Sequence, residues 1–272
     1  MYKRIITGLI LGFVMISALL VNEISAVMLL STIAIFSSFE WRKCFLVPKK
    51  RRNIFLIVSI ILLFSGLILA FQLEASTLRR IGNVLCIISI IQILLYLFSL
   101  IKTFPPDWFA KIGPGILYII LPTIAAIYFL LENFELHRYL LLSFIIINWS
   151  NDTMAYFGGK LYGRNPLAPT ISPKKTIEGS ITGLIFGIVS FYLCNLFFNF
   201  ELNNVAITII AIAIVIAGAL GDLFESSLKR LVQIKDSGKL LPGHGGFLDR
   251  FDSFYFVLPV GILLYYTFIH RS

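Results

Sequence analysis

The sequence contains little charge and little cysteine. Charged residues make up only 14% of its 272 residues, whereas hydrophobic residues make up 58%. Soluble domains carry about 25% charged and about 45–50% apolar residues, so a water-soluble globular protein is excluded and an integral membrane protein is indicated. The three cysteines, Cys44, Cys86 and Cys194, lie far apart, and the last two occur in apolar runs. Neither a disulfide framework nor a cysteine-based metal site is therefore indicated.

Long apolar runs recur along the whole chain. A membrane helix needs about 17–25 apolar residues, because ~30 Å of hydrocarbon is crossed at about 1.5 Å per residue. We expect an all-α integral membrane protein with about nine transmembrane helices; eight or ten are the alternatives, since the second run is short. The first run lacks a cleavage motif, so we expect it to be retained. The expected spans are Ile5–Val21, Ile24–Phe39, Ile54–Phe71, Ile81–Ile101, Gly115–Leu131, Tyr139–Phe157, Ile177–Phe200, Val205–Glu225 and Phe254–Ile269.

The basic residues predict the orientation of these helices. With the N-terminus in the cytosol, 19 of the 23 Lys and Arg residues fall in inner loops. Membrane proteins keep Lys and Arg on the cytosolic side, so this orientation is favoured. The net charge of +9 is then a consequence of topology, and no nucleic-acid partner is needed. The basic residues left on the outer side are Arg79, Arg80, Arg138 and Arg271.

The two halves of the chain differ in where they place polar groups. We expect residues 1–131 to be lipid-facing structural helices, and residues 132–272, with cytosolic loops 158–176 and 226–253, to carry the function. A charge at a helix centre costs about 2.5–3.5 kcal/mol, so polar groups within the apolar runs must face one another, a cation or water. We therefore expect a polar cavity open to the cytosol. The groups concerned are Asn148, Asn151, Asp152, Glu178, Asp222, Glu225, Asp249 and Asp252.

The most polar stretch runs from Gly221 to Ser253 and holds five acidic and five basic residues. In its first part, acidic, hydroxyl and basic side chains recur at the intervals i, i+3, i+4 and i+7, and this spacing places them on one face of a helix. Such a stripe alone is more often a solvated salt bridge. The uncharged run before it favours an acid embedded at the membrane instead. The residues on this face are Asp222, Glu225, Ser226 and Lys229.

A glycine-rich loop follows, with one Pro and three Gly in Pro242–Gly246. It cannot form a regular helix, and its backbone N–H groups can form an anion-binding concavity. Asp249 and Asp252 come directly after it, and paired carboxylates suit Mg²⁺. Two interpretations of His244 stay open, a direct role or a hydrogen bond to the backbone. No Cys or second His lies at the spacing of a zinc site.

An earlier loop shows a similar pattern. Asp152 ends the sixth expected span, and glycines, lysines and hydroxyls lead to the next helix through Ser172-Pro173-Lys174-Lys175-Thr176. A helix start with such residues suits a phosphate, although the string lacks the P-loop spacing and topology alone could explain its lysines. Acids for a divalent cation, bases for phosphates and lipid-facing helices together favour chemistry on a phosphorylated lipid with a water-soluble phosphate donor.

These residues also carry a resemblance. Ser226-x-x-Lys229-Arg230-x4-Lys235-Asp236, followed by Pro242-Gly243-His244-Gly245-Gly246-x-Leu248-Asp249-Arg250-x-Asp252, resembles the signature of the phosphatidate cytidylyltransferases (CDP-diacylglycerol synthases). The resemblance implies that phosphatidate and CTP are converted to CDP-diacylglycerol and pyrophosphate. It also implies Mg²⁺, a second, monovalent cation, membrane lipids as partners and a homodimer. The location implied is the inner membrane of a bacterium, with the site facing the cytosol.

The resemblance implies a role for each matching residue. Asp222 and Asp249 would hold the divalent cation, with Asp252 assisting. The groups implied in catalysis are Asp222, Asp249, Lys229, Arg250 and Ser226. The groups implied in substrate binding are Lys229, Arg230, Lys235, His244, Gly245, Gly246, Lys174, Lys175 and Asp152.

Two other classes of protein compete with this interpretation. A secondary transporter would use membrane acids as an ion path, but it predicts charges in both halves or an inverted repeat. A different CTP-using lipid kinase or transferase would need similar cation and phosphate groups. The residues around His244 favour the cytidylyltransferase.

Overall fold

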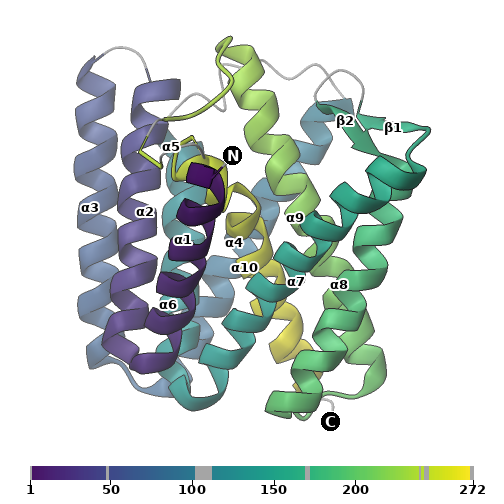
Figure 1. Ribbon diagram of the computed structural model, residues 1–272. Helices are drawn as coiled ribbons and strands as arrows, with labels where there is room; N and C mark the ends of the chain where they lie inside the picture. Colours follow the sequence, from purple (N-terminus) through teal and green to yellow (C-terminus); the bar gives the residue numbers. More distant parts are fainter. Residues whose placement is uncertain are drawn as a thin grey trace.

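The computed structural model describes residues 2–46, 49–101, 112–168, 172–238, 240–241 and 245–269. These residues form a bundle of helices with one small β-hairpin at one end (Figure 1). The helices are α1 (Tyr2–Val21), α2 (Glu23–Phe45), α3 (Lys49–Gln72), α4 (Ala75–Ile101), α5 (Ile112–Gly115), a π-helical turn (Ile116–Ile120), α6 (Leu121–Glu132), α7 (Phe134–Tyr162), α8 (Ile177–Phe198), α9 (Asn204–Leu231) and α10 (Leu248–Ile269), and the strands are β1 (Pro166–Ala168) and β2 (Ser172–Thr176).

The all-α membrane class is confirmed. Within the described residues, six helices are long and apolar enough to cross a membrane, namely α2, α3, α4, α8, α9 and α10. Shorter apolar helices occupy Ile6–Val21 and Ile116–Glu132. The count of about nine spans, the cytosolic N-terminus and the division of the chain at residue 131 stay predictions.

Several helices extend beyond their expected spans. The second span is not short, because α2 continues past Phe39 to Phe45. A tight turn precedes it, in which Asn22 Oδ1 accepts a hydrogen bond from Ser25 N at 2.8 Å, and Ser25 Oγ accepts one from Asn22 N at 3.2 Å. Helix α10 begins at Leu248, six residues before the expected start. Because of these extensions, side chains expected in loops lie on regular helices.

The β-hairpin in the 158–176 loop was not expected. Strands β1 and β2 pair antiparallel. Glu178, on the first turn of α8, accepts hydrogen bonds from Arg164 N at 3.1 Å and Asn165 Nδ2 at 2.8 Å. Thr176 caps the same helix by accepting from Gly179 N at 3.2 Å. The hairpin is therefore anchored on the start of α8, and the strand that carries Lys175 has a defined place.

Helices α7 and α8 pack closely side by side (Figure 1). Two glycines of α8 allow this approach. A Cβ at Gly179 would lie 2.6 Å from the Ala155 carbonyl oxygen, and a Cβ at Gly183 would lie 2.5 Å from Asn151 Oδ1. Small residues let membrane helices approach this closely, so α7 carries Asn151 and Asp152 on a rigid helix pair.

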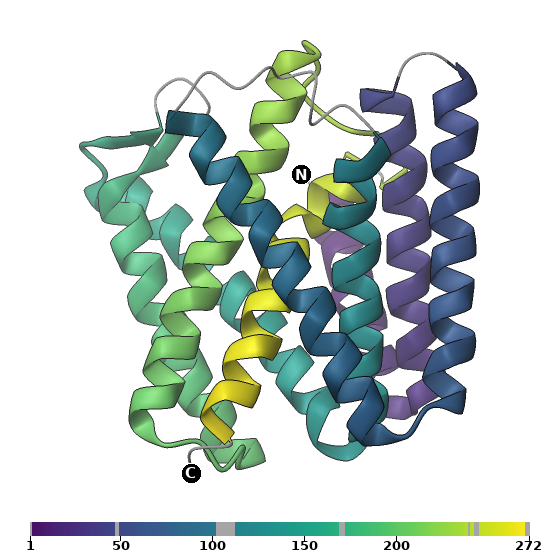
Figure 2. The ribbon, with the colours of Figure 1, turned by 180° about the vertical axis from the view of Figure 1, so that it is seen from behind.

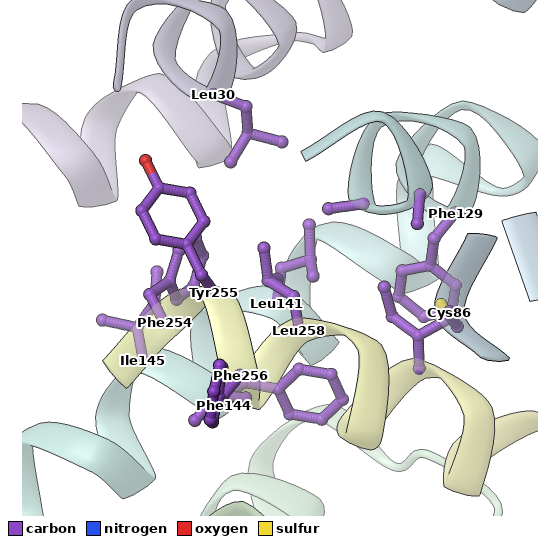
Figure 3. Close-up of a cluster of buried hydrophobic side chains, with 14 of the residues drawn as sticks. Leu30, Cys86, Phe129, Leu141, Phe144, Ile145, Phe254, Tyr255, Phe256 and Leu258 are labelled. Carbon is purple, nitrogen blue, oxygen red and sulfur yellow. The ribbon is translucent and has the colours of Figure 1, made fainter. Parts of the chain in front are cut away.

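Helix α10 is the most buried of the helices that could cross a membrane. It packs against α9 and is crossed by α4 on the other side (Figure 2). Its Tyr255, Phe256 and Leu258 belong to the buried cluster in Figure 3, together with Phe144 of α7 and Phe129 of α6. This packing against both halves of the chain holds the first turn of α10 in place.

Candidate active site

A cavity of about 1280 Å³ lies between α1, α7, the β-hairpin, α9 and α10. One part is lined by charged side chains from the last four of these elements. Another part is lined by Leu9, Phe13 and Ile16 of α1 and by Trp149 of α7. The charged groups that line it include Asp152, Lys160, Lys175, Asp222, Lys229, Asp236, Asp249, Arg250 and Asp252. The cavity therefore combines a charged wall with an apolar wall.

Asp249 is the best-connected carboxylate of the cavity. It lies on the first turn of α10, and its Oδ1 accepts from Lys229 Nζ at 2.8 Å. Its Oδ2 accepts from Gly246 N at 2.8 Å and from Ser237 N at 3.0 Å. Lys229 also forms an ion pair with Glu225, whose side chain is fully buried. One lysine thus pairs with two buried carboxylates.

A second group of acids lies across three elements. Asp222 of α9 forms an ion pair with Lys175 of β2. Asp252 of α10 lies near enough to Asp222 and Asp152 for their negative charges to act on it. Asn151 Nδ2 donates to Asp152 Oδ1 at 3.2 Å. The charges of Lys175 and Arg250 also act on Asp152, so this part of the cavity carries acidic and basic side chains side by side.

The donor chemistry of these carboxylates fits Mg²⁺. Among the described residues, no group of three or more His, Cys, Asp or Glu side chains is arranged to hold a metal ion. Magnesium is usually bound by one or two carboxylates together with substrate phosphates, and it prefers oxygen. Asp222, Asp249 and Asp252 line one cavity. They therefore suit an ion whose coordination the substrate completes.

The structure brings together only some of the site residues that the sequence predicted. Asp152, Lys175, Asp222, Lys229, Asp249, Arg250 and Asp252 all line the cavity. Ser226, Arg230 and Lys235 are described but are not among its lining residues, and the two basic side chains are exposed.

The glycine-rich loop is described only in part. Gly246 N donates to Asp249, and Gly245 has φ +86°, a left-handed conformation that glycine adopts without steric cost. His244 and the side chain of Lys174 lie outside the described residues.

Sequence reasoning missed Glu40, which belongs to α2 in the N-terminal half. Its carboxylate is buried and accepts hydrogen bonds from Ser237 Oγ at 3.1 Å and Leu248 N at 2.8 Å. The expected span ended at Phe39, so Glu40 would have been a loop residue beside Arg42 and Lys43. An acid among the basic residues of an inner loop was the only available signal.

The apolar wall was also missed. Gly12 of α1 faces Trp149 of α7, where a Cβ would lie 3.5 Å from the indole ring. Helix α1 had been expected to face lipid. The sequence contains no signal for its pairing with α7, because an apolar helix that lines a cavity has the same composition as one that faces lipid.

The chain is similar to known proteins along most of its length. The Cytidylyltransferase family matches residues 2–268. A phosphatidate cytidylyltransferase of Staphylococcus haemolyticus is 47% identical over 137 residues, which cover 50% of this chain and 52% of the relative. One of Staphylococcus epidermidis is 46% identical over 145 residues, covering 53% and 55%. The chain thus spans about half the length of the curated relatives it matches. Because the family match covers nearly the whole sequence, this chain belongs to the cytidylyltransferase family.

Proposed function

We propose that this protein transfers the cytidylyl group of CTP to phosphatidate, giving CDP-diacylglycerol and pyrophosphate for phospholipid synthesis. The family and the names of the similar proteins support the reaction class. In the reaction, a phosphate oxygen of phosphatidate attacks the α-phosphorus of CTP. The bond to the β-phosphate oxygen breaks, and pyrophosphate leaves with both electrons of that bond.

The observation that carries the proposal is the combination of two walls in one cavity. The charged wall, with Lys175, Lys229 and Arg250, suits a triphosphate and a lipid phosphate. The apolar wall, with Phe13 and Trp149, suits an acyl chain. A polar nucleotide and a lipid must meet for this reaction, and a cavity with only one kind of wall could not hold both.

The residues act mainly through their charge. Lys175, Lys229 and Arg250 bind the phosphates and neutralise the charge that grows on the leaving pyrophosphate. Asp152, Gly245, Gly246, Lys174 and His244 bind substrate. Arg230 and Lys235, both exposed, attract the nucleotide from solvent, and Ser226 donates a hydrogen bond to a phosphate. A general base is not required, because the attacking phosphate is already an anion at neutral pH.

Asp222, Asp249 and Asp252 would hold Mg²⁺, and a second, monovalent cation is part of the proposal. When bound, Mg²⁺ supplies positive charge that stabilises the oxygens of the reacting phosphates. In the structure, Lys175 pairs with Asp222 and Lys229 pairs with Asp249. Each ion pair thus holds a lysine side chain in the part of the cavity where the phosphates are proposed to bind.

We place the protein in the inner membrane of a bacterium, with the cavity facing the cytosol. The bacterial relatives and the apolar helices support a multi-pass bacterial membrane protein. The distribution of Lys and Arg supports the orientation, and CTP is a cytosolic metabolite. The homodimer implied by the family resemblance is part of the same proposal.

The purified protein in mixed micelles tests the function. With CTP, phosphatidate and Mg²⁺, we expect equal amounts of CDP-diacylglycerol and pyrophosphate. Diacylglycerol in place of phosphatidate is the matched control, because it has the same acyl chains and no attacking phosphate. Release of CDP would indicate a CTP-using kinase, and no turnover in a folded sample would contradict the proposal. Chelation of divalent cations should stop the reaction, and added Mg²⁺ should restore it.

A further inference from the structure

Glu40 connects the N-terminal half of the chain to the charged wall. It lies near the end of α2 and is only 2% exposed. Its Oε2 accepts from Ser237 Oγ at 3.1 Å and from Leu248 N at 2.8 Å. Ser237 lies within the loop that joins α9 to α10, and Leu248 directly follows that loop. Leu248 is the first residue of α10, so a carboxylate from another helix caps its positive end.

Asp249 binds the same loop from the other side. Its oxygens accept from Ser237 N, at 3.1 and 3.0 Å, and from Gly246 N at 2.8 Å. Ser237 therefore donates its hydroxyl to Glu40 and its backbone N–H to Asp249. The loop ends are held between two carboxylates, and a shift of one should alter the geometry of the other.

The loop sequence leaves space for the Glu40 side chain. A Cβ at Gly238 or at Gly246 would collide with the Glu40 carboxylate. A further contact comes from the same helix, since Cys44 Sγ donates to the Ser237 carbonyl oxygen at 3.0 Å. Two residues of α2, one helical turn apart, thus form hydrogen bonds with Ser237. These bonds fix the position of Ser237 on α2.

We propose that Glu40 is a positioning residue for the transfer reaction: it fixes Ser237 and the start of α10, and thereby the orientation of Asp249. This role rests on the proposed function of the cavity. Glu40 is not among the residues that line the cavity. A buried acid that only stabilised the fold could accept hydrogen bonds from any donors. The donors to Glu40 are instead Ser237, which also donates to Asp249, and Leu248, the residue directly before Asp249. Supporting groups of this kind typically change activity by about 10–100-fold when removed.

Three variants separate the effect of side-chain length from the effect of charge at position 40. Glu40→Ala removes the carboxylate, and we expect kcat to fall by about 10–100-fold, with little change in the KM for phosphatidate. Glu40→Asp keeps the charge but shortens the side chain, so it should also lose activity. Glu40→Gln keeps the length and one acceptor, so it should recover part of the loss. Glu23→Gln, an exposed position on the same helix, is the matched control and should behave as wild type.

The thiol of Cys44 gives a readout that does not depend on turnover. In a background with Cys86→Ala and Cys194→Ala, both buried positions, a water-soluble maleimide should label Cys44 faster in Glu40→Ala and Glu40→Asp than in wild type. Faster labelling would indicate that the loop has left α2.

Each outcome decides the proposal. Wild-type labelling rates in all folded variants would contradict it, even if activity fell. A wild-type kcat in Glu40→Ala would also contradict it. So would a rise in the KM for phosphatidate as large as the fall in kcat. If Glu40→Ala does not fold, the Asp and Gln variants carry the test. If the wild-type protein transfers no cytidylyl group, the proposed function fails, and the labelling rates still show whether Glu40 holds the loop.

Discussion

Lys175 and Asp222 form an ion pair between β2 and α9, although 47 residues separate them in sequence. Both side chains are about one-third exposed, at 35% and 33%, and both line the cavity. The pair joins β2 to the polar stretch that runs from Gly221 to Ser253. The lysine pairs with a carboxylate whose charge also acts on Asp252 and Asp152, and the proposed function assigns the lysine to the substrate phosphates.

Replacing this lysine should impair turnover strongly. We expect Lys175→Met to lower kcat by about 10²-fold, because one cationic donor to the transition state is lost. The variant should still insert in the membrane, since the side chain is partly exposed. Pyrophosphate release at saturating CTP and phosphatidate measures the effect. Lys50→Met, an exposed position on α3, is the matched control. Wild-type turnover in Lys175→Met would contradict a phosphate-binding role.

Replacing Asp249 should separate activity from folding. Asp249→Ala should abolish detectable turnover but leave membrane insertion intact. Asp249→Asn can still accept a hydrogen bond from Gly246 N, so it should keep this contact, which Asp249→Ala loses. It should nevertheless be inactive, because the negative charge beside Lys229 is lost. Turnover and size-exclusion profiles in detergent measure the two properties. Glu135→Gln, exposed at 79%, is the control, and near-normal activity in Asp249→Asn would refute the proposed charge role.

The helical spacing on α9 predicted much of the site. Asp222 and Lys229, seven residues apart, both line the cavity, and Glu225 pairs with Lys229. Periodicity predicts which residues share a face because the helix repeat is regular. Ser226 shares this face but does not line the cavity, since a face of helical residues is wider than the strip that borders a cleft.

Partners from distant elements could not be predicted in the same way. Glu40 is 208 residues from Leu248, and the choice of α2 as neighbour of the α10 start depends on packing of apolar helices. Apolar helices have similar compositions, so the sequence does not distinguish a helix that borders the site from one that faces lipid. The hairpin was missed for a different reason, because strands of three and five residues are too short for a pattern.

The α7–α8 contact predicts that one glycine is indispensable. Gly183→Ala should destabilise the protein by about 1–3 kcal/mol, as expected for overpacking of a tight interface, because its Cβ would lie 2.5 Å from Asn151 Oδ1. Thermal unfolding in detergent measures the change. Gly82→Ala is the matched control, since its Cβ would meet its nearest neighbour, Tyr128 Cβ, at an ordinary 3.6 Å. Equal unfolding midpoints for both variants would show that α7 and α8 are less closely packed than the structure indicates.

Filling the apolar wall should affect the lipid substrate alone. Gly12 lines the cavity from α1, opposite Trp149, and Gly12→Leu would place four additional carbons where an acyl chain is proposed to lie. We expect a higher KM for phosphatidate and an unchanged KM for CTP, because the charged groups come from other elements. Val14→Leu, an exposed position of α1 outside the cavity lining, is the control. If Gly12→Leu raised the KM for CTP as much as that for phosphatidate, the two walls would not serve separate substrates.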